Sequence, residues 1–109
     1  MQRRVGVQQE AGMNNRVRFQ RLLPIGSVVN LGDYEKRLMI VGRGVGAPGE
    51  DHLHDYCSVP FPEGYEDGDH LIIHDHSDIS SITRIGYIND GEMELAELIE
   101  KELRAQDTK

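Results

Sequence analysis

Histidines are the residues of this chain best suited to metal chemistry, and all five fall between residues 52 and 76. They include two pairs with i,i+2 spacing, a spacing that points both side chains to one face of a β-strand. Two such pairs on neighbouring strands would hold a zinc or nickel ion. The chain lacks the HExxH and CxxC motifs of dedicated metal sites, and this segment is rich in acids. We therefore interpret the cluster as a solvated, acidic, imidazole-rich face, and keep as the alternative a metal site made of His52, His54, His74 and His76.

The nucleophiles of the chain do not form a catalytic set. The one cysteine is Cys57, and His54, three residues before it, would point to the opposite face of a strand. No serine has a nucleophile-elbow pattern, and no carboxylate pair has apolar surroundings that would raise its pKa toward neutral. We expect a buried, unreactive Cys57, no catalytic residues and no cofactor. The sequence thus predicts a protein that is not an enzyme.

The densest apolar segment consists of two runs around a polar pentapeptide. The first run covers residues 22–31, the second covers residues 37–43, and a loop from Gly32 to Lys36 separates them. Two branched apolar runs joined by a short polar loop predict antiparallel strands in a hairpin. Apolar residues occupy both faces of residues 38–41, so we expect this strand to be central in the sheet or covered on both faces.

Three more strands are predicted, at residues 54–59, 70–74 and 82–89. Pro60 and Pro62 should end the first of these or confine it to an edge, because proline cannot donate a hydrogen bond to a ladder. A single helical turn is expected at residues 77–81.

The C-terminal segment has the pattern of an amphipathic helix. Asp90 is the expected N-cap, because its side chain can accept from the free N–H groups of the first turn. An apolar stripe at 3.6-residue spacing should pack on the sheet; its members are Leu95, Ala96, Leu98, Ile99 and Leu103.

These elements predict an α+β fold, with a small, strongly curved antiparallel sheet of about five strands packed by the C-terminal helix. We expect the sheet to be partly closed and barrel-like. The 109 residues suffice for one domain, which we place at residues 22–106. A basic, flexible N-terminal arm (1–21) precedes it and a short tail (107–109) follows; the alternative for the arm is a strand added to an edge of the sheet.

The charged residues are unevenly distributed along the chain. Residues 1–21 carry five arginines against one acid, whereas residues 22–109 carry 7 basic and 18 acidic side chains, a net charge of −11. So acidic a body excludes general binding to nucleic acid, whose phosphates need a basic surface. No apolar run approaches the ~20 residues that span a bilayer, and no apolar segment follows the N-terminal arginines as in a secretory signal. With one cysteine and hence no internal disulfide, the sequence predicts a cytoplasmic protein without membrane insertion.

Short motifs follow one another through residues 22–103. They are Leu22-Leu23-Pro24-Ile25-Gly26-Ser27-Val28-Val29, Lys36-Arg37-Leu38-Met39-Ile40-Val41-Gly42-Arg43, Asp55-Tyr56, Phe61-Pro62-Glu63-Gly64, His76-Ser77-Asp78-Ile79 and Gly86-Tyr87. In these motifs the chain resembles a family of small Gram-positive bacterial proteins classified as a domain of unknown function. The resemblance implies an accessory role in the type VII secretion systems of Firmicutes, as a cytoplasmic partner in the export of LXG-type toxins. It implies no catalytic residues, and of the five histidines only His76 belongs to the pattern.

The function that the resemblance implies is a non-enzymatic adaptor or chaperone that binds a toxin or secretion component. The alternatives are a metal-dependent enzyme and an immunity protein for an adjacent toxin. A sheet built from so short a chain leaves an edge open, so we also expect a homo-oligomer. The expected partner-binding residues are Arg43, Tyr56, Glu63, His76, Asp78 and Tyr87.

Overall fold

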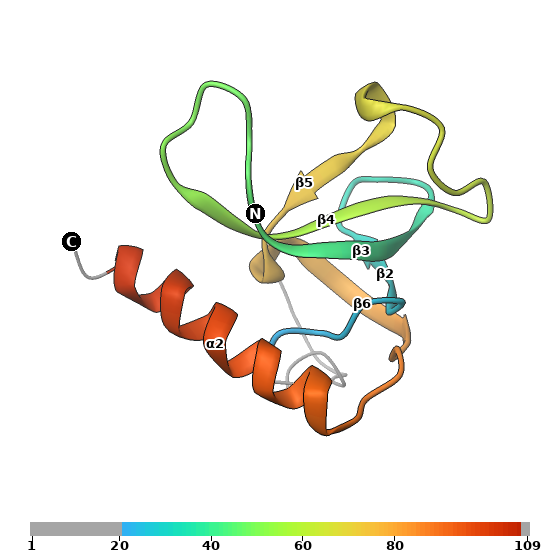
Figure 1. Ribbon diagram of the computed structural model, residues 1–109. Helices are drawn as coiled ribbons and strands as arrows, with labels where there is room; N and C mark the ends of the chain where they lie inside the picture. Colours follow the sequence, from blue (N-terminus) through green and yellow to red (C-terminus); the bar gives the residue numbers. More distant parts are fainter. Residues whose placement is uncertain (1–20, 108–109) are drawn as a thin grey trace.

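The computed structural model describes residues 21–107 as one antiparallel sheet of five strands and a C-terminal helix, which is an α+β fold (Figure 1). The strands are β2 (Val28–Leu31), β3 (Arg37–Gly46), β4 (Leu53–Phe61), β5 (Ile72–His74) and β6 (Ile79–Arg84), and the helix is α2 (Asp90–Asp107). Short 3-10 turns lie at Gly68–His70 and His76–Asp78. Among the described residues, no helix is long and apolar enough to cross a membrane. Residues 1–20 of the predicted arm lie outside the described residues.

The predicted hairpin forms the centre of the sheet, whose order is β5-β4-β3-β2-β6. Val28 of β2 lies opposite Met39 of β3, and Val29 lies opposite Leu38. The pairing continues beyond the N-terminal end of β2, where Ile40 N donates to Ser27 O at 2.9 Å. As expected, β3 has neighbours on both sides, because β4 pairs with it along almost its whole length.

The sheet is strongly curved. β5 ends at His74 and β6 begins at Ile79, yet these two strands lie at opposite ends of the sheet order. The five residue steps between them span at most about 18 Å even when extended, and three of these residues form a compact 3-10 turn. A flat sheet of this size separates its outer strands by about 19 Å, or four spacings of about 4.8 Å. The sheet must therefore curl, but β5 and β6 do not pair, so the predicted barrel-like closure is not confirmed.

The bounds of β4 and β6 differ from the predicted ones. β4 continues through Pro60, which lies opposite Leu38. This proline is tolerated because β5 pairs only with residues 56–58 of β4, so the strand has one neighbour at Pro60. β6 begins at Ile79, within the segment expected to be a helical turn, and ends at Arg84 rather than Asn89.

The helix α2 packs against β3 and β4 (Figure 1). Its N-cap is Asn89 and not the expected Asp90, because Asn89 Oδ1 accepts from the backbone N–H of Glu92 at 2.9 Å. The apolar stripe is narrower than predicted. Ala96 and Leu103 are buried and Ile99 is half-buried, whereas Leu95 and Leu98 are 51% and 60% exposed.

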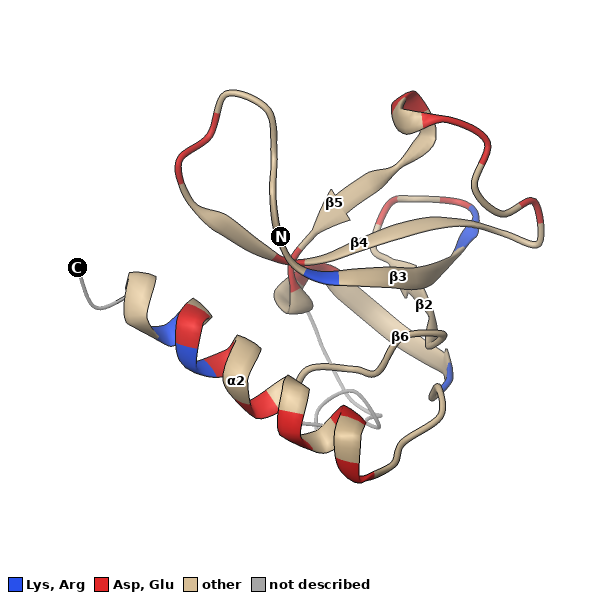
Figure 2. Cartoon of the chain, viewed as in Figure 1, with Lys and Arg blue, Asp and Glu red and all other residues tan. Residues whose placement is uncertain are grey.

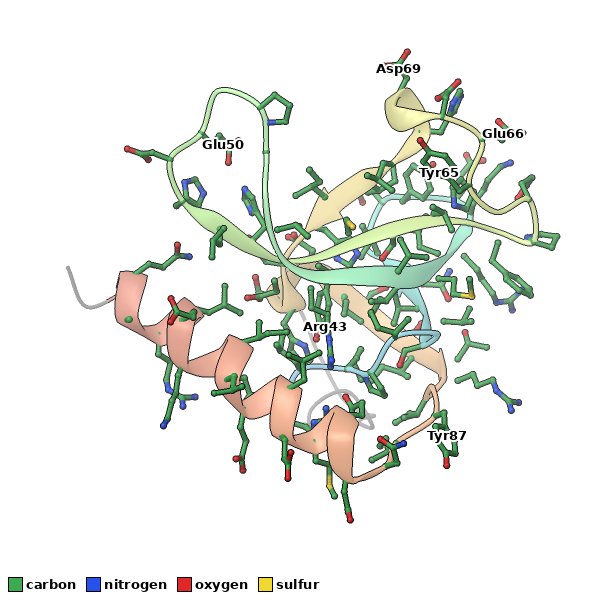
Figure 3. All side chains as sticks on the ribbon, in the orientation of Figure 1. Arg43, Glu50, Tyr65, Glu66, Asp69 and Tyr87 are labelled. Atoms are coloured by element: carbon green, nitrogen blue, oxygen red, sulfur yellow. The ribbon has the colours of Figure 1, made fainter. Side chains whose placement is uncertain are left out.

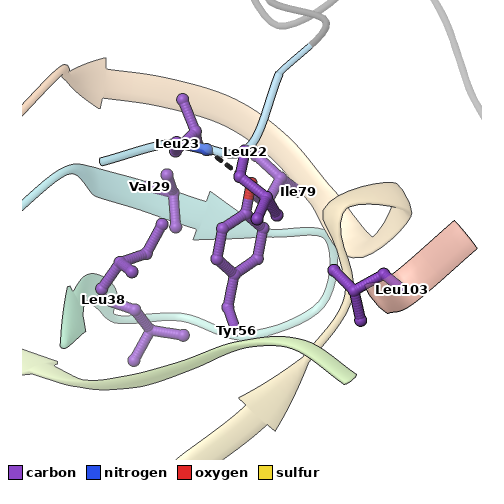
Figure 4. Close-up of a cluster of buried hydrophobic side chains, with 8 residues drawn as sticks. Leu22, Leu23, Val29, Leu38, Tyr56, Ile79 and Leu103 are labelled. Atoms are coloured by element: carbon purple, nitrogen blue, oxygen red, sulfur yellow. Dashed lines mark hydrogen bonds between the residues drawn. The ribbon is translucent and has the colours of Figure 1, made fainter. Parts of the chain in front are cut away.

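The core lies between the inner face of the curved sheet, the segment that precedes β2, and α2 (Figure 4). Both residues at the start of that segment, Leu22 and Leu23, are buried, although they belong to no strand. The core cluster consists of Leu22, Leu23, Val29, Leu38, Ile40, Tyr56, Ile79 and Leu103.

Candidate functional site

Two histidines and a glutamate meet where the β3–β4 loop enters β4. Glu50 Oε1 lies 2.6 Å from His54 Nε2 and 3.3 Å from His52 Nε2. The two imidazole rings are neighbours, with centroids 4.7 Å apart, as their i,i+2 spacing predicts. Within residues 21–107, this is the group of three or more His, Cys, Asp or Glu side chains whose ligand atoms all lie within 4.8 Å of one another. We refer to Glu50, His52 and His54 as the imidazole–carboxylate cluster.

A tight turn positions Glu50. The sequence Ala47-Pro48-Gly49-Glu50 has proline second and glycine third, and Gly49 has a φ of +80°. The backbone N–H of Glu50 donates to Ala47 O at 3.1 Å, which closes the turn. A left-handed third residue after proline is the pattern of a type II turn. The turn therefore reverses the chain just before the two histidines.

Asp75 holds His54 from the other side. Its Oδ2 lies 3.2 Å from His54 Nδ1, and its Oδ1 accepts from the backbone N–H of Asp55 at 3.0 Å. A carboxylate only accepts, so this contact keeps the proton on Nδ1. Hydrogen bonds to Glu50 first, and to Asp75 second, raise the pKa of His54 above its ordinary value. Asp75 thus fixes the ring orientation of His54 and holds a proton on Nδ1, while Nε2 faces the carboxylate of Glu50.

The end of β5 explains why the four predicted histidines do not meet. Opposite residues of β4 and β5 are Tyr56 with His74 and Ser58 with Ile72. If the ladder continued, His54 would lie opposite His76. The strand instead ends at His74, and Asp78 Oδ2 accepts from the backbone N–H of Asp75 at 2.8 Å in the following 3-10 turn. The turn brings the Asp75 carboxylate to His54 in place of the imidazole of His76.

His74 is buried, and both of its ring nitrogens are in use. Nδ1 lies 3.4 Å from the carbonyl oxygen of Asp75, so it carries the proton, and Nε2 accepts from Ser58 Oγ at 2.8 Å. Burial lowers the pKa of His74, which favours the neutral ring. His74 is therefore part of the folded interior and not a metal ligand, contrary to the alternative drawn from the sequence.

His76 is linked to the core through Tyr56. The Tyr56 hydroxyl accepts from the backbone N–H of Leu23 at 2.9 Å (Figure 4). It also lies 2.7 Å from His76 Nδ1. Burial raises the pKa of Tyr56, so the phenol stays protonated and can donate to the imidazole. One hydroxyl thus joins the segment before β2, the strand β4 and the turn after β5.

Replacing Tyr56 by Phe should lower the free energy of unfolding by about 1–3 kcal/mol. The ring is kept, but the buried N–H of Leu23 loses its acceptor. Urea denaturation measures the change. Tyr65→Phe is the control, because Tyr65 is 65% exposed; equal stability of the two variants would contradict the role given to the Tyr56 hydroxyl.

The six expected partner-binding residues divide between interior and surface. Tyr56 is fully buried, and the side chain of Arg43 is 2% exposed, so the structure assigns both to the fold rather than to a partner surface. Glu63 is exposed in an ion pair with Lys36, and Asp78 is exposed in the 3-10 turn. Tyr87 is 79% exposed in the loop before α2 (Figure 3). The sixth residue, His76, is half-buried against Tyr56.

Cys57 is buried, as expected, and burial raises the pKa of its thiol.

Sequence reasoning missed two residues around the histidines: Glu50 of the imidazole–carboxylate cluster, and Asp75, which contacts His54. The Pro48-Gly49 turn before His52 is the signal that could have placed Glu50. Asp75 had no such signal, because its contact depends on where β5 ends.

Comparison with known proteins assigns a family but no activity. The family described as Domain of unknown function (DUF4176) matches residues 22–95, more than half of the chain. No curated protein and no solved structure gives a significant match. The chain therefore belongs to the DUF4176 family of unknown function.

Proposed function

We propose that this protein is a non-enzymatic accessory factor of type VII secretion, which binds an LXG-type toxin or a secretion component in the cytoplasm as an adaptor or chaperone. The motif resemblance described above supports the role. The observation that carries the binding mode is an exposed apolar surface beside the start of α2. It lies within the family match and includes Tyr87, an expected partner-binding residue.

Close backbone packing assembles this surface from two distant segments. A Cβ atom added to Gly86 would lie only 2.2 Å from the carbonyl oxygen of Ile25, so the two backbones touch. Ile25 is 46% exposed and Tyr87 is 79% exposed. We name the group Ile25, Ile85, Tyr87 and Ile88 the Gly86 patch; all four side chains are exposed. Where exposed apolar side chains that lie near one another form a contiguous surface, they mark an interaction site more often than scattered ones do.

The surroundings of the Gly86 patch favour a basic partner. The helix that follows it carries exposed Asp90, Glu94 and Glu97 in its first half, and Figure 2 shows acidic residues along α2 and in the loops. A negative surface speeds association with a positively charged partner and makes binding sensitive to salt. The partner is therefore expected to present an apolar segment flanked by Lys and Arg.

A binding experiment tests the proposal by comparing a variant of the Gly86 patch with a control variant at an exposed tyrosine elsewhere. The double variant Tyr87→Ser/Ile88→Ser should lower the affinity for an LXG-type toxin of the same secretion locus at least about tenfold, as loss of an aromatic anchor does. Tyr65→Ser is the matched control, because Tyr65 is also highly exposed but lies in the β4–β5 loop (Figure 3). Co-purification followed by titration calorimetry measures both.

The outcomes separate the candidate functions. No binding by the unmodified chain, together with normal toxin export after its deletion, would remove the adaptor role. Rescue of cells that express the active toxin, without any effect on export, would favour an immunity protein. Light scattering shows whether the Gly86 patch instead joins two copies of this chain, as the expected homo-oligomer would require.

A further inference from the structure

We infer that the imidazole–carboxylate cluster is a surface site for one divalent metal ion of the zinc class, with Glu50, His52 and His54 as ligands and Asp75 as the residue that positions His54. This inference does not depend on the proposed adaptor role. It also differs from the four-histidine site considered from the sequence, since His74 and His76 take no part.

The donor set favours zinc and the neighbouring late first-row metals. Two imidazole nitrogens and one carboxylate oxygen match the ligands of zinc sites with three protein ligands and an open position. Magnesium and calcium prefer oxygen ligands throughout, so the paired histidines disfavour them. Both His52 and Glu50 are about half exposed, with side-chain values of 53% and 42%. The remaining coordination positions therefore face solvent, where water can complete the shell.

Two of the three distances between ligand atoms are close to those that a metal needs, and all three are within 4.8 Å. Ligands held about 2.0–2.2 Å from a tetrahedral zinc ion lie about 3.3–3.6 Å from one another. The 3.3 Å between Glu50 Oε1 and His52 Nε2 already falls in this range. The 2.6 Å between Glu50 Oε1 and His54 Nε2 is a hydrogen bond that must open by less than about 1 Å. The exposed side chains of Glu50 and His52 can make this adjustment by rotation.

Asp75 supplies the outer contact that metal-binding histidines commonly have. Its carboxylate lies against His54 Nδ1, so Nδ1 keeps its proton, and Nε2 is the nitrogen left to bind an ion once it releases the proton that it donates to Glu50. Such a carboxylate fixes the ring and makes the ligating nitrogen more basic. Asp75 is itself anchored by the backbone N–H of Asp55. A bound ion would therefore tie the β3–β4 loop to the connection between β5 and β6.

Zinc titration of the untagged full chain by calorimetry tests this site. We expect about one ion per chain, and a rise in melting temperature with zinc concentration, because the ion binds the folded state. Replacing zinc by cobalt should give the visible absorption of a site with nitrogen and oxygen ligands. His52→Ala and His54→Ala should each abolish stoichiometric binding. Asp75→Asn should weaken binding about 10–100-fold, as loss of an outer carboxylate does.

His70→Ala is the matched control, because His70 is also exposed and also pairs with an acid, Asp67. It should bind zinc as the unmodified chain does. His52→Ala removes an exposed side chain and should fold normally, so its loss of binding cannot come from unfolding. The assignment would be overturned if the unmodified chain showed no stoichiometric binding, or if His52→Ala and His54→Ala still bound zinc as the unmodified chain does.

Discussion

Replacing Glu92 by Gln is expected to lower the free energy of unfolding by about 3–5 kcal/mol, because it leaves a buried cation without its counter-ion. The side chain of Arg43 is 2% exposed and lies between α2 and the sheet (Figure 3). Its Nη1 donates to Glu92 Oε2 at 2.7 Å and to Leu23 O at 3.3 Å. Arg21 donates to the same Glu92 oxygen. One carboxylate thus joins the helix, the strand β3 and the segment before β2, and urea denaturation at neutral pH measures its contribution.

A double-mutant cycle distinguishes this pair from ordinary surface ion pairs. Arg43→Met should also destabilise strongly, but Arg43→Met/Glu92→Gln should cost clearly less than the sum of the single variants, because no buried charge is left unpaired. The control cycle uses Lys36 and Glu63, whose side chains are 53% and 40% exposed, and it should show little coupling. Additive effects at Arg43 and Glu92 would contradict the buried-pair explanation.

The ion pair of Arg43 and Glu92 also predicts how the free energy of unfolding depends on pH. Burial by itself would raise the pKa of Glu92, but hydrogen bonds from Arg21 and Arg43 outweigh it, and the folded-state pKa is lowered. A lowered folded-state pKa means that the contribution is complete above the unfolded-state pKa and is lost as the pH falls through the folded-state pKa. Glu92→Gln should therefore lose less stability than the unmodified chain between neutral pH and about pH 3.

Gly86→Ala is expected to destabilise the protein by about 3 kcal/mol or more, at the upper end of overpacking effects. The added Cβ would lie 2.2 Å from Ile25 O and 3.0 Å from Ser27 N. These are backbone atoms, which cannot rotate away as a side chain would. The N–H of Gly86 also donates to the buried Ser27 hydroxyl at 2.9 Å, so moving the loop breaks a hydrogen bond. Thermal denaturation measures the loss.

Gly32→Ala is the control for this prediction, because no atom lies within 4 Å of the position of its added Cβ. Its stability should stay within about 0.5 kcal/mol of the unmodified chain. If Gly86→Ala is folded but loosened, the Gly86 patch should also lose partner affinity, because Ile25 and Tyr87 depend on this contact for their relative positions. If Gly86→Ala were as stable as Gly32→Ala, the loop would accommodate the added methyl group without loss of stability, and the prediction would be wrong.

Local patterns were sufficient for the elements that depend on neighbouring residues. The hairpin of β2 and β3 followed from two apolar runs around a short polar loop, and β3 is a central strand that pairs with β2 and β4. Its second face is not fully covered, because Val41 is 38% exposed. The helix also formed where the periodicity placed it. Its N-cap moved by one residue to Asn89, since either of two adjacent polar side chains can cap. A shift of one residue is smaller than the precision with which sequence signals place the end of a helix.

Long-range placement determined the rest. Pro60 remains inside β4 because β5 is too short to pair beside it. Leu95 and Leu98 are exposed because the helix turns Glu92 toward the sheet, where its carboxylate pairs with the buried Arg43. In the sequence Arg43 is a charged residue at the end of an apolar run, and it was one of the expected partner-binding residues. Its burial depends on a carboxylate 49 residues away in the chain.

For the candidate metal site, the i,i+2 spacing alone predicted that His52 and His54 lie close together, and they do so although His52 lies in the bend just before β4. Only the tertiary structure decided which ligands join them. The register of β4 and β5 places Tyr56 opposite His74, and the 3-10 turn after His74 brings Asp75 to His54. Register and strand length arise from contacts between segments that are distant in sequence, so spacing along one strand cannot encode them.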